Sequence, residues 1–495
     1  MVLKLSKTQI FILLILVTIG IIFIILNQGL FNPLIGLSVI SVLMLGIICS
    51  FFKINFLFSL LILFIPFSIN INIAGTESNI MFPSEPLTAV LTVAVLSKLI
   101  FFSEFSVKFI KHPLTCLIII YFSLLAVSAC FSNLPIVSLK FLLVRFCYIL
   151  VFYFLTHLFI KNSIINGIKI YLYYCYALVP IIIYALYRHS LFHFEKTDSP
   201  FMSEPFFNDH TIYSACLAFV LPAITASFLF SDKLGLSLFK KTASFFLMSL
   251  FCIAIFFSYS RAAWISIIVS LLFVLILMLK IRGRFILFIF IILGAIAIEN
   301  KDSIIDSFNL NTSDSNVRNA DAEQVAKSIT NVSNDISNAE RLNRWSCAVR
   351  MTESKPLFGF GPGTYQFNYL SFQLASEMTR ISVHSSYNVE KGRGGTAHSE
   401  YLLLLSESGI FTFISFLGII LTAVYTGAKI FYNTKNVQLK IVTASALLGL
   451  VSYVTHGIFN NFLDTDKAAF LFWSSLSVIT TLDLYRIQTG KPKEV

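Results

Sequence analysis

The stretch that decides the fold is residues 299–399, one long polar segment in a chain otherwise built from apolar runs. It carries three notable motifs: Glu340-Arg341-Leu342-Asn343-Arg344-Trp345, then Pro356-Leu357-Phe358-Gly359-Phe360-Gly361-Pro362-Gly363, and finally Ala397-His398-Ser399-Glu400-Tyr401-Leu402. The third motif leads directly into the next apolar run. Because nearly all of the polar material is gathered in this one loop, we expect the chemistry of the protein to take place there.

Composition defines the class of protein. Hydrophobic residues make up 57% of the 495 residues and charged residues 12%, whereas a soluble domain has about 25% charged residues; the mean hydropathy is +0.83. Runs of about 20 apolar residues can cross a bilayer as helices, and these runs lack the alternation of barrel strands. The sequence therefore predicts an all-α polytopic membrane protein with about 12–14 transmembrane helices. The expected spans lie near 8–26, 32–52, 55–73, 86–102, 113–131, 138–160, 166–187, 211–230, 243–259, 262–280, 284–299, 401–427, 438–459 and 467–486.

The positive charge is explained by topology. The net charge is +11, and the lysines and arginines concentrate in every second short loop. The positive-inside rule then places both termini in the cytoplasm and the 299–399 loop outside, so the charge does not indicate a nucleic-acid partner. We expect three regions: an N-terminal bundle (1–298), a large, mostly helical outer loop (299–400) and C-terminal transmembrane helices with a tail (401–495).

Within the outer loop, residues 301–338 are rich in Asn, Ser and Asp and are expected to be loosely structured. The following segment, Arg341–Thr352, predicts an amphipathic helix with Leu342, Trp345 and Val349 on its apolar face. Arg341 and Arg344 lie one turn apart and are expected to share another face. Gly359, Gly361 and Gly363 permit close backbone approach to a ligand or to another loop. Because no βαβ unit surrounds these glycines, a nucleotide-binding loop is excluded.

Two residues are candidates for chemistry at the membrane surface. Arg261 stands between two apolar runs, where an ionisable group usually faces a cavity or a charged partner, and its guanidinium suits phosphate oxygens. The alternative is an arginine that only reaches the interface. His398 can take a proton from a hydroxyl group, although a histidine before a helix is more often structural. Asp464 and Asp466 have the spacing of a metal-binding pair, but two such carboxylates more often cap a helix.

Taken together, these motifs resemble the O-antigen ligase and O-antigen polymerase superfamily of bacterial inner-membrane glycosyltransferases. The resemblance covers residues 257–418: Ser-Arg-small-small at a helix start, Arg-Leu-x-x-Trp, Pro-x-x-Gly-x-Gly-x-Gly, His-Ser-x-Tyr-Leu and the Glu-x-Gly of Glu407 and Gly409. Residues 208–213, Asn-Asp-His-Thr-Ile-Tyr, also resemble a short periplasmic loop of the family. The chain departs from many members in having His398-Ser399 where they have His-Asn, and in having more than about twelve expected spans, so the subfamily stays open.

The resemblance implies an inverting, C-type-like transferase that moves a glycan from undecaprenyl diphosphate to an acceptor sugar hydroxyl, as on lipid A–core. The reaction would take place on the periplasmic side of the inner membrane, with membrane lipids around the protein and without a metal or other cofactor. Arg261 and Arg341 would bind the diphosphate, and His398 would deprotonate or orient the acceptor. Further substrate-binding candidates are Arg344 (a reserve for the diphosphate), Trp345, Gly361, Gly363, Asp209 and His210.

Several alternatives remain at this point. A polymerase of the same superfamily would join one repeat unit to another, and a related transferase would use a protein hydroxyl as its acceptor. A lipid-linked oligosaccharide flippase would also have twelve to fourteen spans, but transporters carry repeats and charges near the midplane. Only Lys140 and Arg145, in the sixth expected span, favour that class, and they could equally approach the donor diphosphate.

Overall fold

The computed structural model describes residue 44 and residues 54–72, 79–101, 104–280, 336–379, 381–390 and 394–489. This part of the chain is almost entirely helical and holds 10 helices long and apolar enough to cross a membrane. The predicted class, an all-α polytopic membrane protein, is confirmed. Of the expected spans, 8–26 and 284–299 lie outside the described residues, as does 32–52 except for Met44.

The ten spans follow the hydropathy pattern closely. They are α4 (Ser84–Phe101), α6 (Pro113–Cys130), α7 with its continuation (Pro135–Ile160), α9 (Ile165–Ser190), α10 (His210–Leu229), α11 (Leu238–Phe257), α12 (Arg261–Met278), α19 (Glu400–Asn433), α20 (Val437–His456) and α21 (Asp466–Thr489). The long α7 span comprises α7 proper (Pro135–Tyr148), a π-helical stretch (Ile149–Leu155) and α8 (Thr156–Ile160). A short α5 (Val107–Ile110) precedes α6.

The expected span at 55–73 is wrong in its second half. Helix α3 (Ile54–Phe64) ends nine residues before the expected end of that span. The chain then forms an antiparallel hairpin, β1 (Ile69–Asn72) with β2 (Asn79–Phe82). The alternating Ile-Asn-Ile-Asn sequence of β1 has the period of a strand, and counting hydropathy alone overlooked it.

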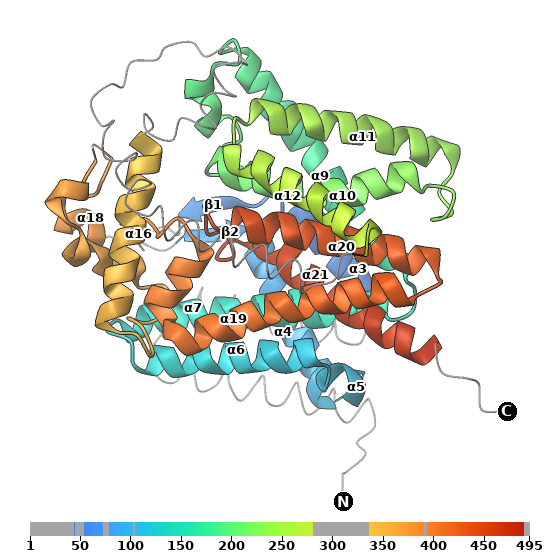
Figure 1. Cartoon of the computed structure of the whole chain (residues 1–495), viewed down its shortest axis with the longest axis horizontal. Coiled ribbons are helices and arrows are strands. Elements are labelled where there is room, and N and C mark those ends of the chain that lie inside the picture. Colours follow the sequence, from blue (N-terminus) through green and yellow to red (C-terminus); the bar gives the residue numbers. More distant parts are fainter. Residues whose placement is uncertain are drawn as a thin grey trace, which may run out of the picture.

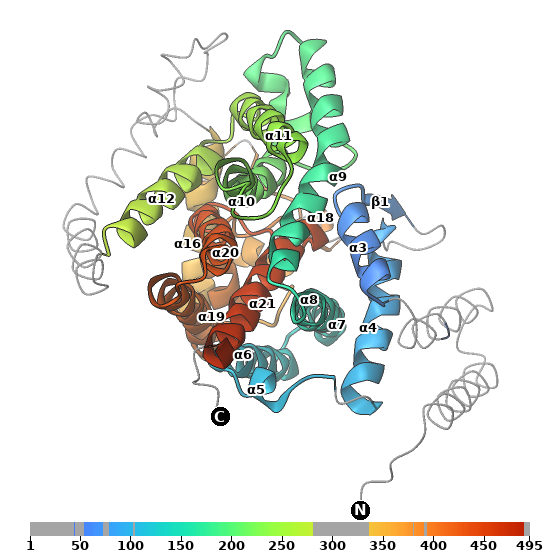
Figure 2. The ribbon, with the colours of Figure 1, turned by 90° about the vertical axis from the view of Figure 1, so that its right-hand side faces the viewer.

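Helix α21 forms the centre of the bundle. Every residue from Asp466 to Asp483 is buried, and the helix lies among α6, the long α7 span, α10, α19 and α20 (Figure 2). Its small polar side chains are satisfied by neighbouring helices: the Ser477 hydroxyl donates to the carbonyl of Tyr153 over 2.6 Å, and Ser475 bonds the Tyr171 hydroxyl over 2.7 Å. Small and hydroxyl-bearing residues let helices approach closely in a membrane, which explains why the most enclosed helix carries so many of them.

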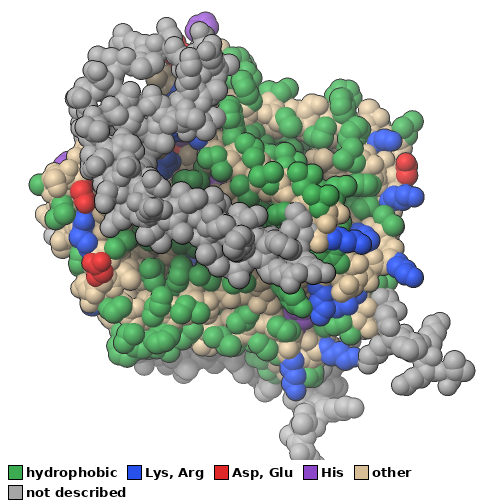
Figure 3. Space-filling view, in the orientation of Figure 1, with side chains coloured by type: hydrophobic (Ala, Val, Ile, Leu, Met, Phe, Trp, Pro, Cys, Tyr) green, Lys and Arg blue, Asp and Glu red, His purple; other side chains and the backbone are tan. Residues whose placement is uncertain are grey.

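Residues 336–379, 381–390 and 394–399 form a polar subdomain at one end of the bundle (Figure 1). It contains α16 (Ile336–Ser354), α17 (Tyr365–Asn368), two short 3₁₀ turns (Tyr369–Phe372 and Ala375–Glu377) and α18 (Ser386–Glu390). Lysine and arginine side chains gather towards the opposite end, where α10 gives way to α11 and α19 to α20 (Figure 3). This separation agrees with the charge pattern of the loops, while the orientation in a membrane stays a prediction.

The helix expected at Arg341–Thr352 exists as α16, but its predicted apolar face is wrong. Val349 is 44% exposed, whereas Cys347, Ala348 and Met351 are buried. The side that faces the subdomain also buries Asn343 and Arg344, whose polar groups are satisfied by the loops packed on them. Tertiary hydrogen bonds therefore outweighed the local apolar pattern.

A break in α19 joins the polar subdomain to the bundle. Gly409 has φ 75° and ψ −179°, and a Cβ there would lie 2.1 Å from the carbonyl oxygen of Leu357. The neighbouring Ile410 N–H donates to the carbonyl of Pro356 over 2.9 Å, and Gly361 N–H donates to the carbonyl of Glu407 over 2.8 Å. The glycine-rich loop thus docks into the interrupted turn of α19.

Candidate functional site

A cavity of about 500 Å³ lies where the polar subdomain meets the ends of α10, α12 and α20. We call it the arginine cavity. Its lining includes Asp209, His210, Arg261, Arg341, His398 and Asn460. The structure therefore brings together five predicted site residues that lie up to 189 positions apart, from Asp209 to His398.

Arg261 and Arg341 approach each other across this cavity from different elements. Arg261 is the first residue of α12, and Arg341 lies in the second turn of α16. Their guanidinium groups each donate to the side-chain oxygen of Asn338 over 3.3 Å. Ser260, the residue before α12, also lines the cavity, and its buried hydroxyl has no hydrogen-bond partner among the described residues. Two guanidinium groups, a hydroxyl and a helix N-terminus make this side of the cavity suited to an anion.

His398 lines the same cavity and is held by its backbone. Its φ of 50° is unusual for a non-glycine residue. Trp345 Nε1 donates to the His398 carbonyl over 3.3 Å, and the His398 N–H donates to the hydroxyl of Thr396 over 3.4 Å. Burial, together with the positive charges of Arg344 and Arg341, lowers the pKa of His398 to about 4. This imidazole is therefore neutral at pH 7 and able to accept a proton.

Asp209 and His210 form an acid–imidazole pair on another wall of the cavity. Nδ1 of His210 lies 2.7 Å from Oδ1 of Asp209. Asp209 caps α10 and accepts from the N–H of Thr211 over 3.1 Å and from its hydroxyl over 2.6 Å. Burial opposes ionisation of Asp209, but the adjacent imidazole of His210 and the hydrogen bonds from Thr211 outweigh that effect and lower its pKa to about 2. The lining of the cavity thus includes a negative charge as well as its arginines.

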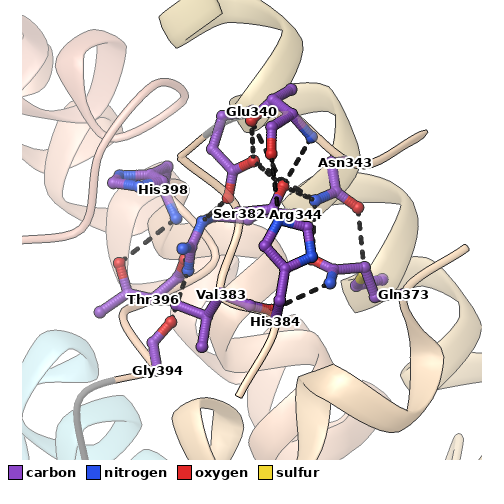
Figure 4. Close-up of polar contacts among 12 residues, drawn as sticks. Glu340, Asn343, Arg344, Gln373, Ser382, Val383, His384, Gly394, Thr396 and His398 are labelled. Atoms are coloured by element: carbon purple, nitrogen blue, oxygen red, sulfur yellow. Dashed lines mark hydrogen bonds and ion pairs between the residues drawn. The ribbon is translucent and has the colours of Figure 1, made fainter. Parts of the chain in front are cut away.

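Arg344 has a different environment from Arg341. It is buried, and its Nε donates to Glu340 over 2.8 Å. Its Nη1 donates to the carbonyls of Gly394 over 2.9 Å and Thr396 over 3.1 Å (Figure 4), and its guanidinium lies 5.0 Å from the ring centre of Tyr369. The structure therefore engages Arg344 with the segment that leads to His398, which we call the strap (residues 394–399).

The predicted glycines lie on the other side of the strap. Gly361 and Gly363 have φ of 111° and 77°, and a Cβ at Gly361 would lie 2.1 Å from the hydroxyl of Ser132. The carboxylate of Glu407 accepts from the N–H groups of Gly363 and Tyr365 over 2.8 and 2.7 Å. Gly363 lines a second cavity, distinct from the arginine cavity. Two roles were expected of these glycines, close approach to a ligand or to another loop. The structure shows the second role for Gly361.

The candidate metal pair is engaged in two separate contacts. Asp464 accepts a hydrogen bond from Arg145 over 2.7 Å. Asp464 is therefore the charged partner of this arginine, which the sequence placed inside a span. Asp466 begins α21 and accepts from Ser84 and from the N–H of Lys467. Among the described residues, no group of three or more His, Cys, Asp or Glu side chains is placed to hold a metal ion.

Sequence reasoning missed Asn338, Asn460 and Asn461, and it noted Ser260 only as the first residue of the Ser-Arg-small-small motif. Asn338 fell inside the segment expected to be loose, yet it is the acceptor shared by both arginines. Asn461 accepts from the hydroxyl of Thr396 over 2.7 Å and ties the strap to the loop after α20. Single polar residues of this kind carry no periodicity or motif, so no signal in one sequence marks them.

The fold and the site define the class: a polytopic α-helical membrane protein with a cationic, histidine-containing cavity between its helix ends and a polar subdomain. The family comparison specifies it further, because residues 244–417 match the family model described as O-antigen ligase. The match confirms the resemblance seen in the motifs and supports an O-antigen ligase- or polymerase-type function with glycosyltransferase-like ligase activity. It includes Arg261, Arg341 and His398. No curated protein matches the chain.

Proposed function

We propose that this protein is an O-antigen ligase-like glycosyltransferase that moves a glycan from undecaprenyl diphosphate to an acceptor sugar hydroxyl, with its site on the periplasmic side of the inner membrane. The observation that carries the proposal is the arginine cavity, in which two arginines and a neutral histidine share one space of about 500 Å³. The family match over residues 244–417 supports the same reaction class.

The arginine side of the cavity suits the leaving group. When the bond between the anomeric carbon and the diphosphate breaks, negative charge develops on the diphosphate, and preorganised donors that face this charge lower the barrier. Arg261 and Arg341 already converge on one oxygen, that of Asn338, and the N-terminus of α12 adds its own partial positive charge. We assign both guanidinium groups to the diphosphate, which would displace the Asn338 contacts.

The histidine side suits the acceptor. In the proposed step the acceptor hydroxyl oxygen attacks the anomeric carbon, its proton passes to the imidazole of His398, and the lipid diphosphate leaves with the electron pair. His398 is neutral before donor binding because burial and two nearby arginines lower its pKa to about 4. A bound diphosphate offsets those positive charges and raises the pKa again, so the histidine becomes a better base only when donor is present.

The proposed side of the membrane rests on charge. The loops with most lysines and arginines lie at the end of the bundle opposite the polar subdomain (Figures 1 and 3), and such loops favour the cytoplasm. The polar subdomain and the arginine cavity would then face the periplasm, where lipid-linked glycans are presented after export.

The test is the glycan phenotype of a deletion strain, read from a lipopolysaccharide gel ladder and from lipid-linked intermediates. A ligase leaves bare core, with long polymer still on its lipid carrier. Core with one repeat unit identifies a polymerase, and repeat units held on the cytoplasmic leaflet identify a flippase and refute the proposal. Complementation with His398→Ala should fail to restore the ladder, with the variant present in the membrane at the wild-type level.

A further inference from the structure

A second cavity, of about 430 Å³, lies on the other side of the strap. It is bounded by α7, by the glycine-rich loop, by Gly395 and Thr396 of the strap, and by Leu463 and Asp464 of the loop between α20 and α21. None of the residues that line it has a role in the proposed donor chemistry. A transferase must bind two substrates, so the second cavity is a candidate site for the second one.

The two cavities share their dividing wall. The strap lines the second cavity with Thr396 and the arginine cavity with His398. The loop after α20 does the same, with Asp464 on one side and Asn460 on the other. At the wall itself, the Thr396 hydroxyl donates to the side-chain oxygen of Asn461 over 2.7 Å. This hydrogen bond therefore joins the strap to the loop after α20, next to residues of both segments that line one cavity or the other.

The lining of the second cavity fits a saccharide. Phe141 and Phe367 provide aromatic surface for sugar rings, and Lys140 stands at the rim as an exposed cation. Asp464 keeps 40% of its side chain exposed although Arg145 holds one of its oxygens. Aromatic surface with a few fixed polar groups is typical of a site that orients a polar ligand, and lysine adds affinity for an acidic or phosphorylated sugar.

The position of α7 fits a ligand anchored in the membrane. Ile136, Leu139, Lys140 and Leu143 follow the spacing of one helical face. The three apolar side chains are 86%, 66% and 62% exposed, and Ile136 and Lys140 line the cavity. A glycolipid whose tail lies along this face would bring an anionic headgroup to Lys140 and its sugars to the cavity.

We propose that the second cavity binds the sugar end of a membrane-anchored, anionic acceptor glycolipid, and that donor and acceptor meet at the wall formed by Thr396 and Asn461. This inference rests on the proposed function and adds the acceptor site to it. Opening of the Thr396–Asn461 contact would let the acceptor hydroxyl reach His398 from the side opposite the leaving diphosphate, as an inverting attack requires.

The test compares two exposed lysines, one at each cavity, in the full-length protein in nanodiscs. Initial rates are measured with undecaprenyl-diphosphate-linked glycan as donor and lipid A–core as acceptor, each varied in turn. Lys140→Glu should raise the KM for acceptor about tenfold and leave the KM for donor unchanged, because it replaces an attractive charge with a repulsive one. Lys196→Glu, at the arginine cavity, should show the reverse split.

A second variant tests the cavity with a substitution that should not disturb folding, and a second acceptor shows which glycolipid binds there. Phe367→Leu keeps the apolar volume but removes the ring, so the KM for acceptor should rise about threefold with an unchanged thermal midpoint. Repeating the series with a second lipid-linked glycan as acceptor distinguishes a polymerase from a ligase by which acceptor shows the effect.

Either of two results overturns the inference: an unchanged acceptor KM in Lys140→Glu and Phe367→Leu, or a donor KM that rises in both. If the wild-type protein transfers glycan to neither acceptor, the proposed function fails and this inference fails with it.

Discussion

Replacing Arg344 with methionine tests what this arginine does. The structure gives its guanidinium three hydrogen bonds: one to Glu340 and two to strap carbonyls, at Gly394 and Thr396. Removing one member of a buried ion pair costs about 3–5 kcal/mol. Glu340 keeps hydrogen bonds from Ser382 and from other side chains (Figure 4), so the lower end of that range, about 3 kcal/mol, applies. Most of this loss should fall on the strap.

Hydrogen–deuterium exchange of the full-length protein measures the loss where it occurs. A local destabilisation of about 3 kcal/mol accelerates exchange of the strap amides about a hundredfold, if they exchange by local opening. Arg350→Met is the matched control, because Arg350 lies on the same helix and pairs with Glu377 over 2.6 Å, away from the strap. That variant should leave exchange of the strap unchanged.

The alternative for Arg344 is the diphosphate role expected from its spacing to Arg341. In that case Arg344→Met would raise the KM for donor and leave strap exchange at the wild-type rate. That result would refute the positional role. Faster deuterium exchange of the strap amides together with loss of transfer would support the positional role, because a displaced strap moves His398.

The other predictions concern the cavity and the α19 break. Arg261→Gln and Arg341→Gln should each reduce transfer from lipid-linked donor about 10²- to 10³-fold, with unchanged thermal midpoints. Normal transfer by either variant would show that the replaced arginine does not bind the diphosphate. Because the pKa of His398 is lowered to about 4, kcat/KM should show no acid limb from this group between pH 5 and 8, and Arg341→Gln should move that limb to higher pH. Below about pH 6.5 the unfolded chain protonates this histidine and the folded chain does not, so the free energy of unfolding should fall as pH drops from about 6.5 towards 4, as a urea series against pH would show. Gly409→Ala should destabilise the fold by at least about 2 kcal/mol, because φ is 75° and the new Cβ would meet Leu357; an unchanged thermal midpoint would contradict this.

The spans could be predicted from the sequence because each is a local property of about 20 residues. Where local rules competed, prediction failed. At 55–73 a strand pattern, Ile69–Asn72, followed a short helix, and hydropathy merged the two. In α16 the spacing of Leu342 and Val349 predicted one buried face, but the hydrogen bonds of Asn343 and Arg344 inside the subdomain determined which face is buried.

The site was predictable only in part, for a different physical reason. Arg261 and His398 stand beside apolar runs, and the cost of placing a charged or titratable group there marks each of them individually. Arg341 was marked only by its spacing to Arg344 and by the Arg-Leu-x-x-Trp motif. Their meeting in one cavity depends on how α12, α16 and α19 pack, which no single segment encodes. The shared acceptor Asn338 and the wall residue Asn461 are ordinary asparagines in the sequence, and only the fold gives them their contacts.

The family match covers part of the lining of each cavity. Arg261, Arg341 and His398, to which the donor chemistry is assigned, lie within residues 244–417, whereas the walls that α7 and the loop carrying Asp464 give to the second cavity lie outside it. A diphosphate leaving group makes the same electrostatic demand whatever glycan it carries, so its ligands can belong to a common segment. Acceptors differ in sugar and charge, and a site assembled partly from other elements can differ with them. On this reasoning, replacing α7 and the α20–α21 loop together with those of a family member that uses another acceptor should change the choice of acceptor while the KM for donor stays constant. A change in donor preference would contradict this division of roles.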